Sequence, residues 1–361
     1  MAAAYTHFLP HLKMIGLTGV RPWLRRDSID LVEMFGLSRP VRLRRLPLLW
    51  SQQKPIFEQD YLPPRWFYSL VGHYARLYRA SLIFTRKPET AVTTIQAGLN
   101  TVLETHVPWE SMPHLHGHRD LLCSPALRTL VVVTPPLGES FSRAGFPEDR
   151  IQVEPDGVDL EQYTPQLTTL EARRKLGLSE VDFLCVYTGH LYRDRGIEVM
   201  IQAARQLENV HILIVGGWER DIAHYQKMAQ ETEATNVTFT GIVPHVKIPL
   251  YQFAADLLLM QYSNKTHHAE RCSPIKVFEY LAAGRPIVST DLPILQTVLH
   301  HEKNAIMVEP DSKESLVEAI QRIRNQPELA KKIATNARDD STRYTWEERA
   351  HRILNHTMGA E

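Results

Sequence analysis

The sequence contains little cysteine and no excess of charge of either sign. Cys123, Cys185 and Cys272 are the only cysteines among 361 residues, and their odd number and spacing match neither a disulfide framework nor a zinc knuckle. We therefore expect a reducing compartment, the cytoplasm. Lysine plus arginine number 41, as do aspartate plus glutamate, so the formal net charge is zero. This balance argues against a general nucleic-acid-binding protein, which contacts phosphates through excess positive charge.

Long apolar runs are also missing. No run approaches the ~20 apolar residues that a membrane-spanning helix needs, and residues 1–13 lack the charged start and apolar core of a signal peptide. Membrane association is therefore expected to be peripheral at most. Residues 1–150 contain 18 basic and 12 acidic side chains, so this basic half is the part expected to meet the inner membrane face or another anionic partner.

Short apolar segments alternate with longer amphipathic ones, a pattern typical of parallel α/β folds. In the first half we predict a helix at residues 65–80 and strands at 81–85, 100–105, 129–134 and 150–155. In the second half we predict strands at 182–189, 210–217, 237–241, 255–262 and 285–290, with helices at 197–207, 222–232, 247–253 and 274–283. Because one sheet rarely exceeds about ten strands, we predict two doubly wound domains.

The domain boundary is expected near residues 159–168. The surrounding stretch, residues 154–178, places glycine, two prolines and a polar segment between the last strand of one domain and the first helix of the next. We predict a first domain at 1–163, a second at 164–343 and a final helix at 344–361. No internal repeat and no low-complexity tract interrupts this organisation.

The stretch CSPIKVFEYLAAGRPIVST, residues 272–290, carries the most chemical information. Ser273 and Pro274 are typical of a helix start, the hydroxyl as a cap and the proline at the first helical position. Lys276 adds a positive charge where the helix dipole favours a carboxylate, which indicates a bound anion such as pyrophosphate. Glu279, near the same helix face, can accept hydrogen bonds from nucleotide sugar hydroxyls. An ordinary surface helix with a lysine and glutamate pair explains this stretch alone equally well.

Two glycine turns follow predicted strands. YTGHLYRDRG, residues 187–196, leaves a strand through Gly189 and reaches Arg195 just before the next helix. The carboxyl edge of an α/β sheet is where such folds bind ligands, and a guanidinium can clamp phosphate oxygens. Gly216 and Gly217 end the next strand and let the backbone approach a ligand, although turn glycines without a ligand are commoner.

Taken together and in this order, these segments resemble retaining nucleotide-sugar glycosyltransferases with the GT-B fold, of the glycosyltransferase family 4 type (glycosyl transferases group 1). The resemblance covers residues 150–312, through PDGVDLEQYTP, YTGHLYRDRG, ILIVGG, VTFTGIVP, YQFAADLLLMQYS and SPIKVFEYLAAGRPIVSTDLP. It implies an α/β protein with two Rossmann-like domains facing across a cleft. It also implies transfer of a hexose from a UDP- or GDP-sugar, with retention of configuration, to an unidentified acceptor that is a glycan, a lipid-linked sugar or a small molecule.

The resemblance also implies roles for individual residues. Arg195 and Lys276 would hold the donor diphosphate, Glu279 would bind the ribose, and the loop at Val243 and Pro244 would lie against the base. The full donor-binding set is Gly189, His190, Arg195, Gly216, Val243, Pro244, Ser273, Pro274, Ile275, Lys276 and Glu279. The catalytic set is His106, Arg195 and Lys276. His106 matches a histidine near the donor sugar in relatives, but a histidine packed at a strand end is an equally good interpretation.

The sequence departs from the family pattern in three places. Many members carry a glutamate eight positions before the one matched by Glu279, where this chain has Arg271, and the basic residue that often follows the glycine turn is here His190. The expected first strand and glycine-rich loop are not recognisable, and the chain is expected to begin close to its first helix, around residues 11–19. A catalytically inactive nucleotide-sugar-binding subunit and a GT-B epimerase therefore remain as alternatives.

Two further patterns concern metals and surfaces. No Asp-x-Asp occurs in the sequence, so we expect neither a paired-carboxylate seat for a divalent ion nor a cofactor beyond the nucleotide-sugar. His114, His116 and His118 would share one face of a strand and permit a metal site, but the proline and glycine among them favour a loop. The basic cluster at residues 39–50 is either a membrane-surface or anionic-acceptor patch or a solvated edge strand; it contains Arg39, Arg42, Arg44, Arg45 and Trp50.

Overall fold

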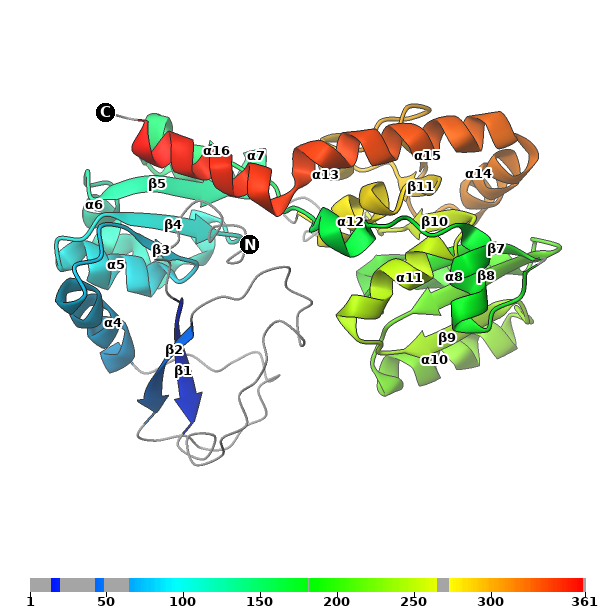
Figure 1. Ribbon diagram of the computed structural model, residues 1–361, viewed down its shortest axis with the longest axis horizontal. Coiled ribbons are helices and arrows are strands. Elements are labelled where there is room, and N and C mark those ends of the chain that lie inside the picture. The colour runs from blue at the N-terminus through cyan, green and yellow to red at the C-terminus, as the bar shows by residue number, and fades with distance from the viewer. Residues whose placement is uncertain (1–13, 20–42, 49–64, 181, 265–272, 360–361) are drawn as a thin grey trace. The chain divides into compact units, whose positions relative to one another are not determined.

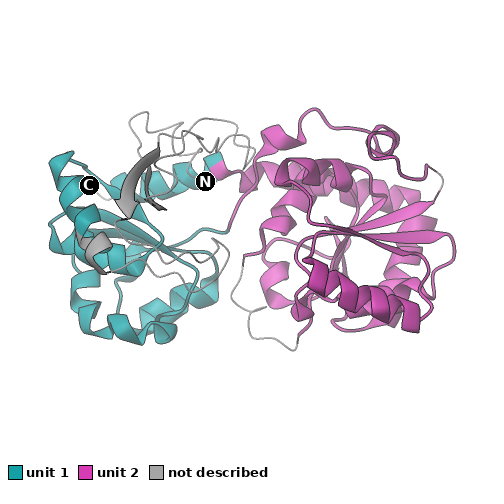
Figure 2. Ribbon diagram, turned by 90° about the horizontal axis from the view of Figure 1, so that it is seen from below, with its two compact units in different colours: residues 1–33, 39–155, 347–361 teal, residues 34–38, 156–346 magenta. Residues whose placement is uncertain are grey.

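The computed structural model describes residues 14–19, 43–48, 65–180, 182–264 and 273–359. The described residues form two compact units, coloured separately in Figure 2. The first unit contains residues up to 155 together with those from 347 onward, and the second contains residues 156–346. Each unit has its own parallel sheet with helices packed on it, so the chain is α/β as predicted.

The second unit is built on six parallel strands. They are β7 (Phe183–Thr188), β8 (Val210–Val215), β9 (Val237–Gly241), β10 (Leu257–Met260), β11 (Ile287–Thr290) and β12 (Ile306–Val308) (Figure 1). Their order across the sheet is β9-β8-β7-β10-β11-β12, so the chain runs from β7 to one edge and then returns to the other side of β7. The reversal between β7 and β10 is the topological switch point, outside whose carboxyl ends open α/β sheets bind ligands.

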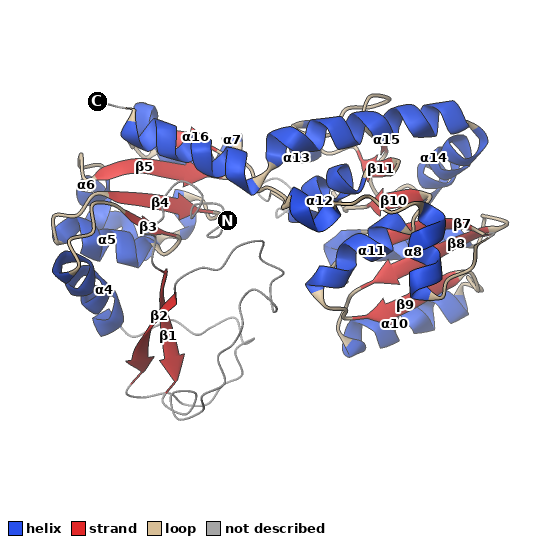
Figure 3. Ribbon diagram, in the orientation of Figure 1, coloured by secondary structure: helices blue, strands red, loops and turns tan. Residues whose placement is uncertain are grey.

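Helices cover both faces of this sheet (Figure 3). They are α8 (Thr169–Leu176), α9 (Ile197–Ala204), α10 (Glu219–Glu231), α11 (Ile248–Phe253), α12 (Ile275–Ala283), α13 (Pro293–Gln296), α14 (Lys313–Asn325) and α15 (Pro327–Ser341). Along β7 the side chains alternate between two buried clusters, with Leu184 and Val186 in one and Cys185 and Tyr187 in the other. A strand buried on both faces needs apolar residues at every position, which explains the unbroken run that predicted it.

The first unit contains a four-stranded parallel sheet in chain order. Its strands are β3 (Ile83–Thr85), β4 (Thr101–Thr105), β5 (Leu127–Val132) and β6 (Ile151–Val153), and its helices are α4 (Arg65–Leu77), α5 (Pro88–Gln96), α6 (Arg119–Leu122), α7 (Pro135–Arg143) and α16 (Trp346–Met358). The last helix, α16, lies beside β5 (Figure 1). A hydrogen bond of 2.9 Å joins the hydroxyls of Thr129 and Thr357, so the end of the chain packs on the first unit.

A separate pair of parallel strands, β1 (Met14–Gly19) and β2 (Leu43–Leu48), comes before α4. The expectation that the chain begins close to its first helix around residues 11–19 is therefore wrong. Residues 14–19 include isoleucine, leucine and threonine, which suit a strand once a partner is present, and that partner is 29 residues further along the chain, where Met14 pairs with Leu43. Arg44 and Arg45 lie in β2, and the other members of the basic cluster lie outside the described residues.

All the strands predicted between residues 81 and 290 are present, most of them shorter than predicted. Strand β12 and helices α14 and α15 were not predicted. In the part of the chain that the structure describes, no helix combines the length and the apolar character needed to cross a membrane.

Candidate functional site

Two cations meet at the switch point of the second unit. Arg195 ends the short 3-10 helix η5 (Arg193–Arg195) between β7 and α9, and Lys276 lies in the first turn of α12. The guanidinium carbon of Arg195 is 4.5 Å from the centroid of the Tyr262 ring, and Nζ of Lys276 is 5.5 Å from the same centroid. The two charged groups therefore lie within about 10 Å of each other. Side chains predicted from separate motifs converge on one place.

The amine of Lys276 is held by aromatic groups. Its Nζ donates a hydrogen bond of 2.9 Å to Oη of Tyr187 and lies 4.0 Å from the centroid of that ring, where the face of the ring attracts a cation. The Tyr187 hydroxyl in turn donates to the carbonyl oxygen of His190 at 2.7 Å. Burial raises the pKa of Tyr187 well above its ordinary value, so this hydroxyl stays neutral while it positions the lysine.

The backbone beneath the amine consists of two glycine turns. Gly189 after β7 has φ of 142° and Gly216 after β8 has φ of 114°, conformations that favour glycine. A Cβ at Gly189 would lie 2.8 Å from Nζ of Lys276, and a Cβ at Gly216 would collide with the carbonyl oxygen of Gly189. Both positions need glycine because the ends of β7 and β8 meet directly under the lysine.

His190 lies beside the cations but adds no charge at neutral pH. Its ring packs against Tyr192 and Trp218, with centroid distances of 5.1 and 6.4 Å. Partial burial of the ring, and then the charges of Lys276 and Arg195, lower the pKa of His190 below its ordinary value. The positive charge of the site therefore comes from Arg195 and Lys276, although Oδ1 of Asp194 lies 3.5 Å from Nε of Arg195 and offsets part of it.

The start of α12 differs from the predicted one. Pro274 is the N-cap and Ile275 the first helical residue, and no side chain caps this helix end. The hydroxyl of Ser273 instead accepts a hydrogen bond of 2.9 Å from the backbone N–H of Asp156. The prediction that Ser273 caps the helix is therefore wrong, because another backbone segment uses its oxygen. The positive end of the helix dipole still lies at Ile275, next to Lys276.

Glu279 is buried in the second turn of α12, and its side chain is 11% exposed. Its Oε1 accepts a hydrogen bond of 3.1 Å from Nε2 of His245, the first residue of the 3-10 helix η6 (His245–Lys247). The hydrogen bond to Glu279 raises the pKa of His245 above its ordinary value, against a smaller opposing effect of burial. Arg285, which follows α12, donates hydrogen bonds to the carbonyl oxygens of Phe253 and Leu167.

His245 is a residue of this site that the sequence reasoning missed. It directly follows Val243 and Pro244, the loop that was expected to lie against a nucleotide base. The side chain of Val243 packs on the core of the unit, whereas Pro244 and His245 are exposed. The position of this histidine at the end of a candidate binding loop was the one signal in the sequence. Its contact with Glu279 could not be predicted from a local pattern, because the two residues are 34 positions apart.

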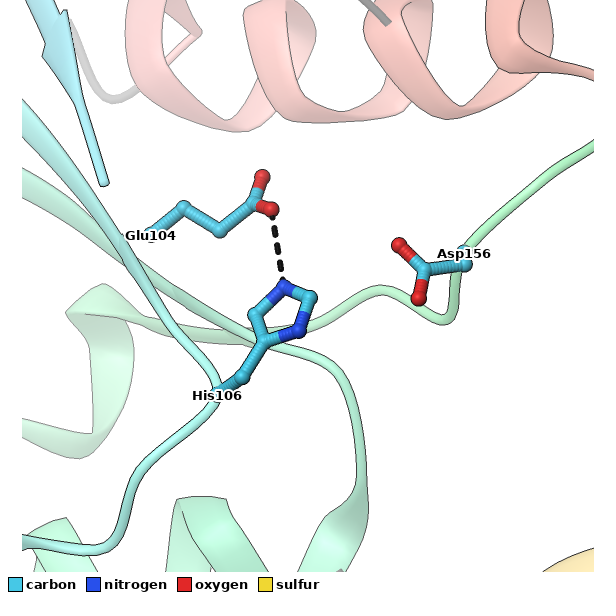
Figure 4. A group of neighbouring side chains, drawn as sticks. All are labelled: Glu104, His106 and Asp156. Carbon is cyan, nitrogen blue, oxygen red and sulfur yellow. Dashed lines mark hydrogen bonds and ion pairs between the residues drawn. The ribbon is translucent and has the colours of Figure 1, made fainter. Parts of the chain in front are cut away.

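His106, the third predicted catalytic residue, lies in the first unit after β4. Its Nε2 is 3.0 Å from Oε1 of the buried Glu104 (Figure 4). Nε of Arg86 is 3.3 Å from the same carboxylate oxygen, and Nη1 of Arg349 is 3.0 Å from the other. Burial alone would raise the pKa of Glu104, but the hydrogen bond with His106 and the charges of Arg349 and Arg86 outweigh it, so the pKa is lowered. A buried anion thus holds the imidazole in place.

The three alternating histidines form part of a 3-10 helix, η2 (Pro113–His118), and not a strand. With about three residues per turn, alternate side chains do not share one face. His114 lies 3.0 Å from a carboxylate oxygen of Glu89, and the ring of His116 packs on Trp109 at 5.0 Å. The condition for a metal site at these histidines is therefore absent. Arg271 lies outside the described residues.

The sequence of the second unit matches a known family. Residues 169–340 match the family model described as glycosyl transferases group 1. An alpha-galactosylglucosyldiacylglycerol synthase from Streptococcus pneumoniae is 27% identical over 224 residues, which cover 60% of this chain and 57% of that protein. A D-inositol 3-phosphate glycosyltransferase from Corynebacterium urealyticum is 26% identical over 57% of this chain and 50% of its own length. The chain thus spans about half the length of the curated relatives it matches.

Solved structures share the fold along most of the chain. A glycosyltransferase from Rickettsia africae superimposes with a TM-score of 0.74 at 14% identity, covering 100% of this chain and 94% of that one. The Anabaena protein Alr3699/HepE, solved in complex with UDP and glucose, gives a TM-score of 0.67 at 18% identity, covering 89% and 87%. With its two Rossmann-like units the chain has the GT-B fold, and residues 169–340 of its second unit match the glycosyl transferases group 1.

Proposed function

We propose that the protein is a retaining, metal-independent hexosyltransferase whose donor is a UDP- or GDP-sugar. The observation that carries this proposal is the convergence of Arg195 and Lys276 on Tyr262 at the switch point, with Glu279 one turn further along α12 than Lys276. Two cations and a helix N-terminus suit a diphosphate, and a carboxylate beside them suits ribose hydroxyls. The crystallised complexes of Alr3699/HepE with UDP and UDP-glucose support a donor of this class.

The chemical step follows from where charge develops. When the bond between the sugar and the diphosphate breaks, negative charge grows on the leaving phosphate oxygen. Hydrogen-bond donors that already point at that oxygen stabilise the transition state more than any other arrangement available to the site. In this proposal the donors are Arg195 and Lys276. The acceptor hydroxyl attacks from the same face, and a phosphate oxygen takes its proton, which gives retention without a protein nucleophile.

The first unit supplies the acceptor side in this proposal. His106, oriented by the buried Glu104, would contact the donor sugar. The acceptor is proposed to be a glycan, a lipid-linked sugar or a small molecule. A lipid-linked acceptor suits a cytoplasmic protein whose basic first half, with six more basic than acidic residues up to residue 150, touches an anionic membrane surface.

A donor screen tests the proposal. Wild-type protein is heated with UDP-glucose, UDP-galactose, GDP-mannose or GDP-glucose at equal concentration, and the melting temperature is recorded. Binding at about 100 times Kd stabilises the folded state by ~2.7 kcal/mol, so donors of one base are expected to raise the melting temperature clearly. If none of the four raises it, the nucleotide-sugar proposal is rejected. The donor that binds is then incubated with candidate acceptors and the products are analysed.

The second candidate is a nucleotide-sugar-binding subunit without catalytic activity. It is favoured by Arg271, which stands where many relatives carry a glutamate near the donor sugar. This candidate predicts a thermal shift with the same donors but neither transfer to an acceptor nor slow hydrolysis of the donor. Release of UDP or GDP from the bound donor would exclude it.

A further inference from the structure

We propose that His245 is a positioning residue that orients the carboxylate of Glu279 for recognition of the ribose. The inference rests on the proposed function, since it needs Glu279 to accept hydrogen bonds from ribose hydroxyls. It adds a residue that none of the sequence motifs contains. The observation behind it is the hydrogen bond of 3.1 Å between Nε2 of His245 and Oε1 of Glu279.

The carboxylate of Glu279 needs a fixed orientation if it is to recognise two neighbouring hydroxyls. An ionised carboxylate offers about four lone-pair sites on its two oxygens, and its plane can rotate unless something fixes it. Glu279 is buried in α12, where an unsatisfied charged group is costly. The N–H of His245 takes one site on Oε1 and thereby fixes the plane of the carboxylate. The remaining lone pairs of the carboxylate then keep one orientation toward the two neighbouring ribose hydroxyls.

His245 is exposed at the surface of the second unit. Its side chain is 53% exposed, whereas that of its partner is 11% exposed. The ring therefore contributes little to the core of the unit, and filling space is not its main role. It lies at the end of the loop containing Val243 and Pro244, between β9 and α11. A residue in this position can hold the carboxylate while leaving room for a ligand next to it.

The hydrogen bond between His245 and Glu279 is assisted by charge. The hydrogen bond to Glu279, helped by the negative charge of that carboxylate, raises the pKa of His245. Hydrogen bonds that involve a charged partner are about twice as strong as neutral ones. Such a bond can fix the rotamer of the buried Glu279 side chain.

The test measures discrimination between ribose and deoxyribose in the full-length chain. Dissociation constants for UDP and 2′-deoxy-UDP are measured by calorimetry, or for the corresponding GDP pair if GDP binds more tightly. The proteins are wild type, His245→Ala, His245→Asn, His245→Gln and Glu279→Gln, with the exposed His224→Ala as a matched control. Loss of one charge-assisted hydrogen bond corresponds to about tenfold in affinity, so wild type is expected to prefer the ribonucleotide by about that factor.

The expected pattern separates orientation from packing. In His245→Ala and His245→Asn the new side chain cannot reach Oε1 of Glu279. The ratio of the dissociation constants for the deoxyribonucleotide and the ribonucleotide should therefore fall toward one, while the melting temperature stays close to that of wild type. His245→Gln should restore the preference, since its amide nitrogen can occupy the place of Nε2. His224→Ala should behave as wild type. Two histidine variants are included so that one remains if the other does not fold.

The remaining outcomes distinguish the inference from the proposed function. If Glu279→Gln loses the preference while His245→Ala and His245→Asn keep it, the positioning role is overturned and the ribose assignment stands. If Glu279→Gln keeps the wild-type preference, the ribose assignment itself is wrong. If neither UDP nor GDP binds the wild-type chain, the proposed function is overturned, and the positioning role with it.

Discussion

Two cations that share one aromatic neighbour define the site at the scale of single residues. Lys276 lies against Tyr187 and Tyr262, and Arg195 against Tyr262. Aromatic faces attract a cation without neutralising it, while Asp194 offsets part of the charge of Arg195. The two side chains can therefore be fixed in place and still attract a diphosphate.

Replacement of Lys276 by alanine should weaken nucleotide binding much more than it weakens the fold. A charge-assisted hydrogen bond contributes ~1.5 to 3 kcal/mol, so the Kd for UDP or GDP is expected to rise about tenfold or more. The melting temperature of the unliganded protein should change little, because Lys276 is only half-buried. Calorimetric titration measures the first quantity and a thermal melt the second, with Lys331→Ala on the exposed side of α15 as control. An unchanged Kd in Lys276→Ala would remove this residue from the phosphate site.

The titration of His245 gives an independent check on its pairing with Glu279. The imidazole is expected to titrate above its ordinary pKa of about 6.5 in wild type, because the bond to Glu279 favours the protonated form. In Glu279→Gln the negative charge is gone, so the pKa should fall. The measurement is an NMR titration of the His245 ring signals. Equal pKa values in the two proteins would contradict the pairing.

The same shift implies a pH dependence of stability. Because the folded-state pKa of His245 is raised, its stabilising contribution is complete below the unfolded value and is lost as the pH rises through the raised folded value. Chemical denaturation of wild type at pH 6 and pH 8, compared with Glu279→Gln, should show this loss in wild type only.

The residues that short motifs specify could be predicted from the sequence, and those that depend on distant contacts could not. Gly189, Arg195 and Lys276 follow strands or begin helices in recognisable patterns, so their meeting at one sheet edge follows from the parallel topology. The pairing of His245 with Glu279 and the use of the Ser273 hydroxyl by Asp156 depend on loops that no local pattern specifies. His114, His116 and His118 show the opposite error, since their spacing suits a metal only if the local conformation is a strand.

At the scale of elements, the buried ion pair between Glu104 on β4 and Arg349 on α16 ties the end of the chain to the first unit. Their side chains are almost fully buried and lie 3.0 Å apart. Arg349 also donates to the carbonyl oxygens of Pro155 and Glu154. One side chain thus links α16 to β4 and to the segment that follows β6.

Breaking this pair should be costly. Arg349→Met leaves Glu104 buried without its main cation, and removal of one partner of a buried pair costs about 3 to 5 kcal/mol. We expect the free energy of unfolding of the first unit, measured by denaturant titration, to fall by about 3 to 5 kcal/mol. The control Arg143→Met removes an exposed arginine of the same unit, whose ion pairs contribute at most about 1 kcal/mol. Similar losses in the two variants would contradict the structural role of Arg349.

The individual strands and helices show why part of the fold could be predicted from the sequence. Strand β10 is an unbroken apolar run, and β7 and β8 are apolar apart from Thr188 and His211. Burial on both faces explains this composition, and each of the three strands was predicted. Strand β12 has three residues and was not predicted, although β3 and β6, which have the same length, were predicted. Helix α14 does carry a detectable period in Leu316, Ile320 and Ile323, all buried, and could have been predicted. Strands β1 and β2 pair across an intervening segment, which no local pattern indicates.

At the scale of the whole molecule, the strand order of the second unit is that of a dinucleotide-type Rossmann fold, and the two-unit organisation could be predicted from the alternation of strands and helices. The bounds of the units could not, since α16 joins the first unit although it ends the chain. That contact connects residues 245 positions apart through Glu104 and Arg349, and local sequence carries no sign of it.

The proposed metal independence is tested by measuring transfer with the complete chain. If Arg195, Lys276 and the start of α12 neutralise the diphosphate, transfer should continue at an undiminished rate in excess EDTA. The measurement is the rate of product formation with and without the chelator, using a donor identified in the thermal screen. Loss of activity in EDTA that added manganese or magnesium restores would refute metal independence.

The most direct test of the account is the affinity of Glu279→Gln for the nucleotide-sugar, measured by calorimetry alongside its melting temperature. Glutamine keeps the size of the side chain but removes the charge-assisted acceptance of ribose hydroxyls. If Glu279 binds the ribose, the Kd should rise about tenfold or more with little change in melting temperature. The exposed control Glu318→Gln on α14 should match wild type. A lowered melting temperature with unchanged nucleotide affinity would contradict the account and leave Glu279 as a structural partner of His245.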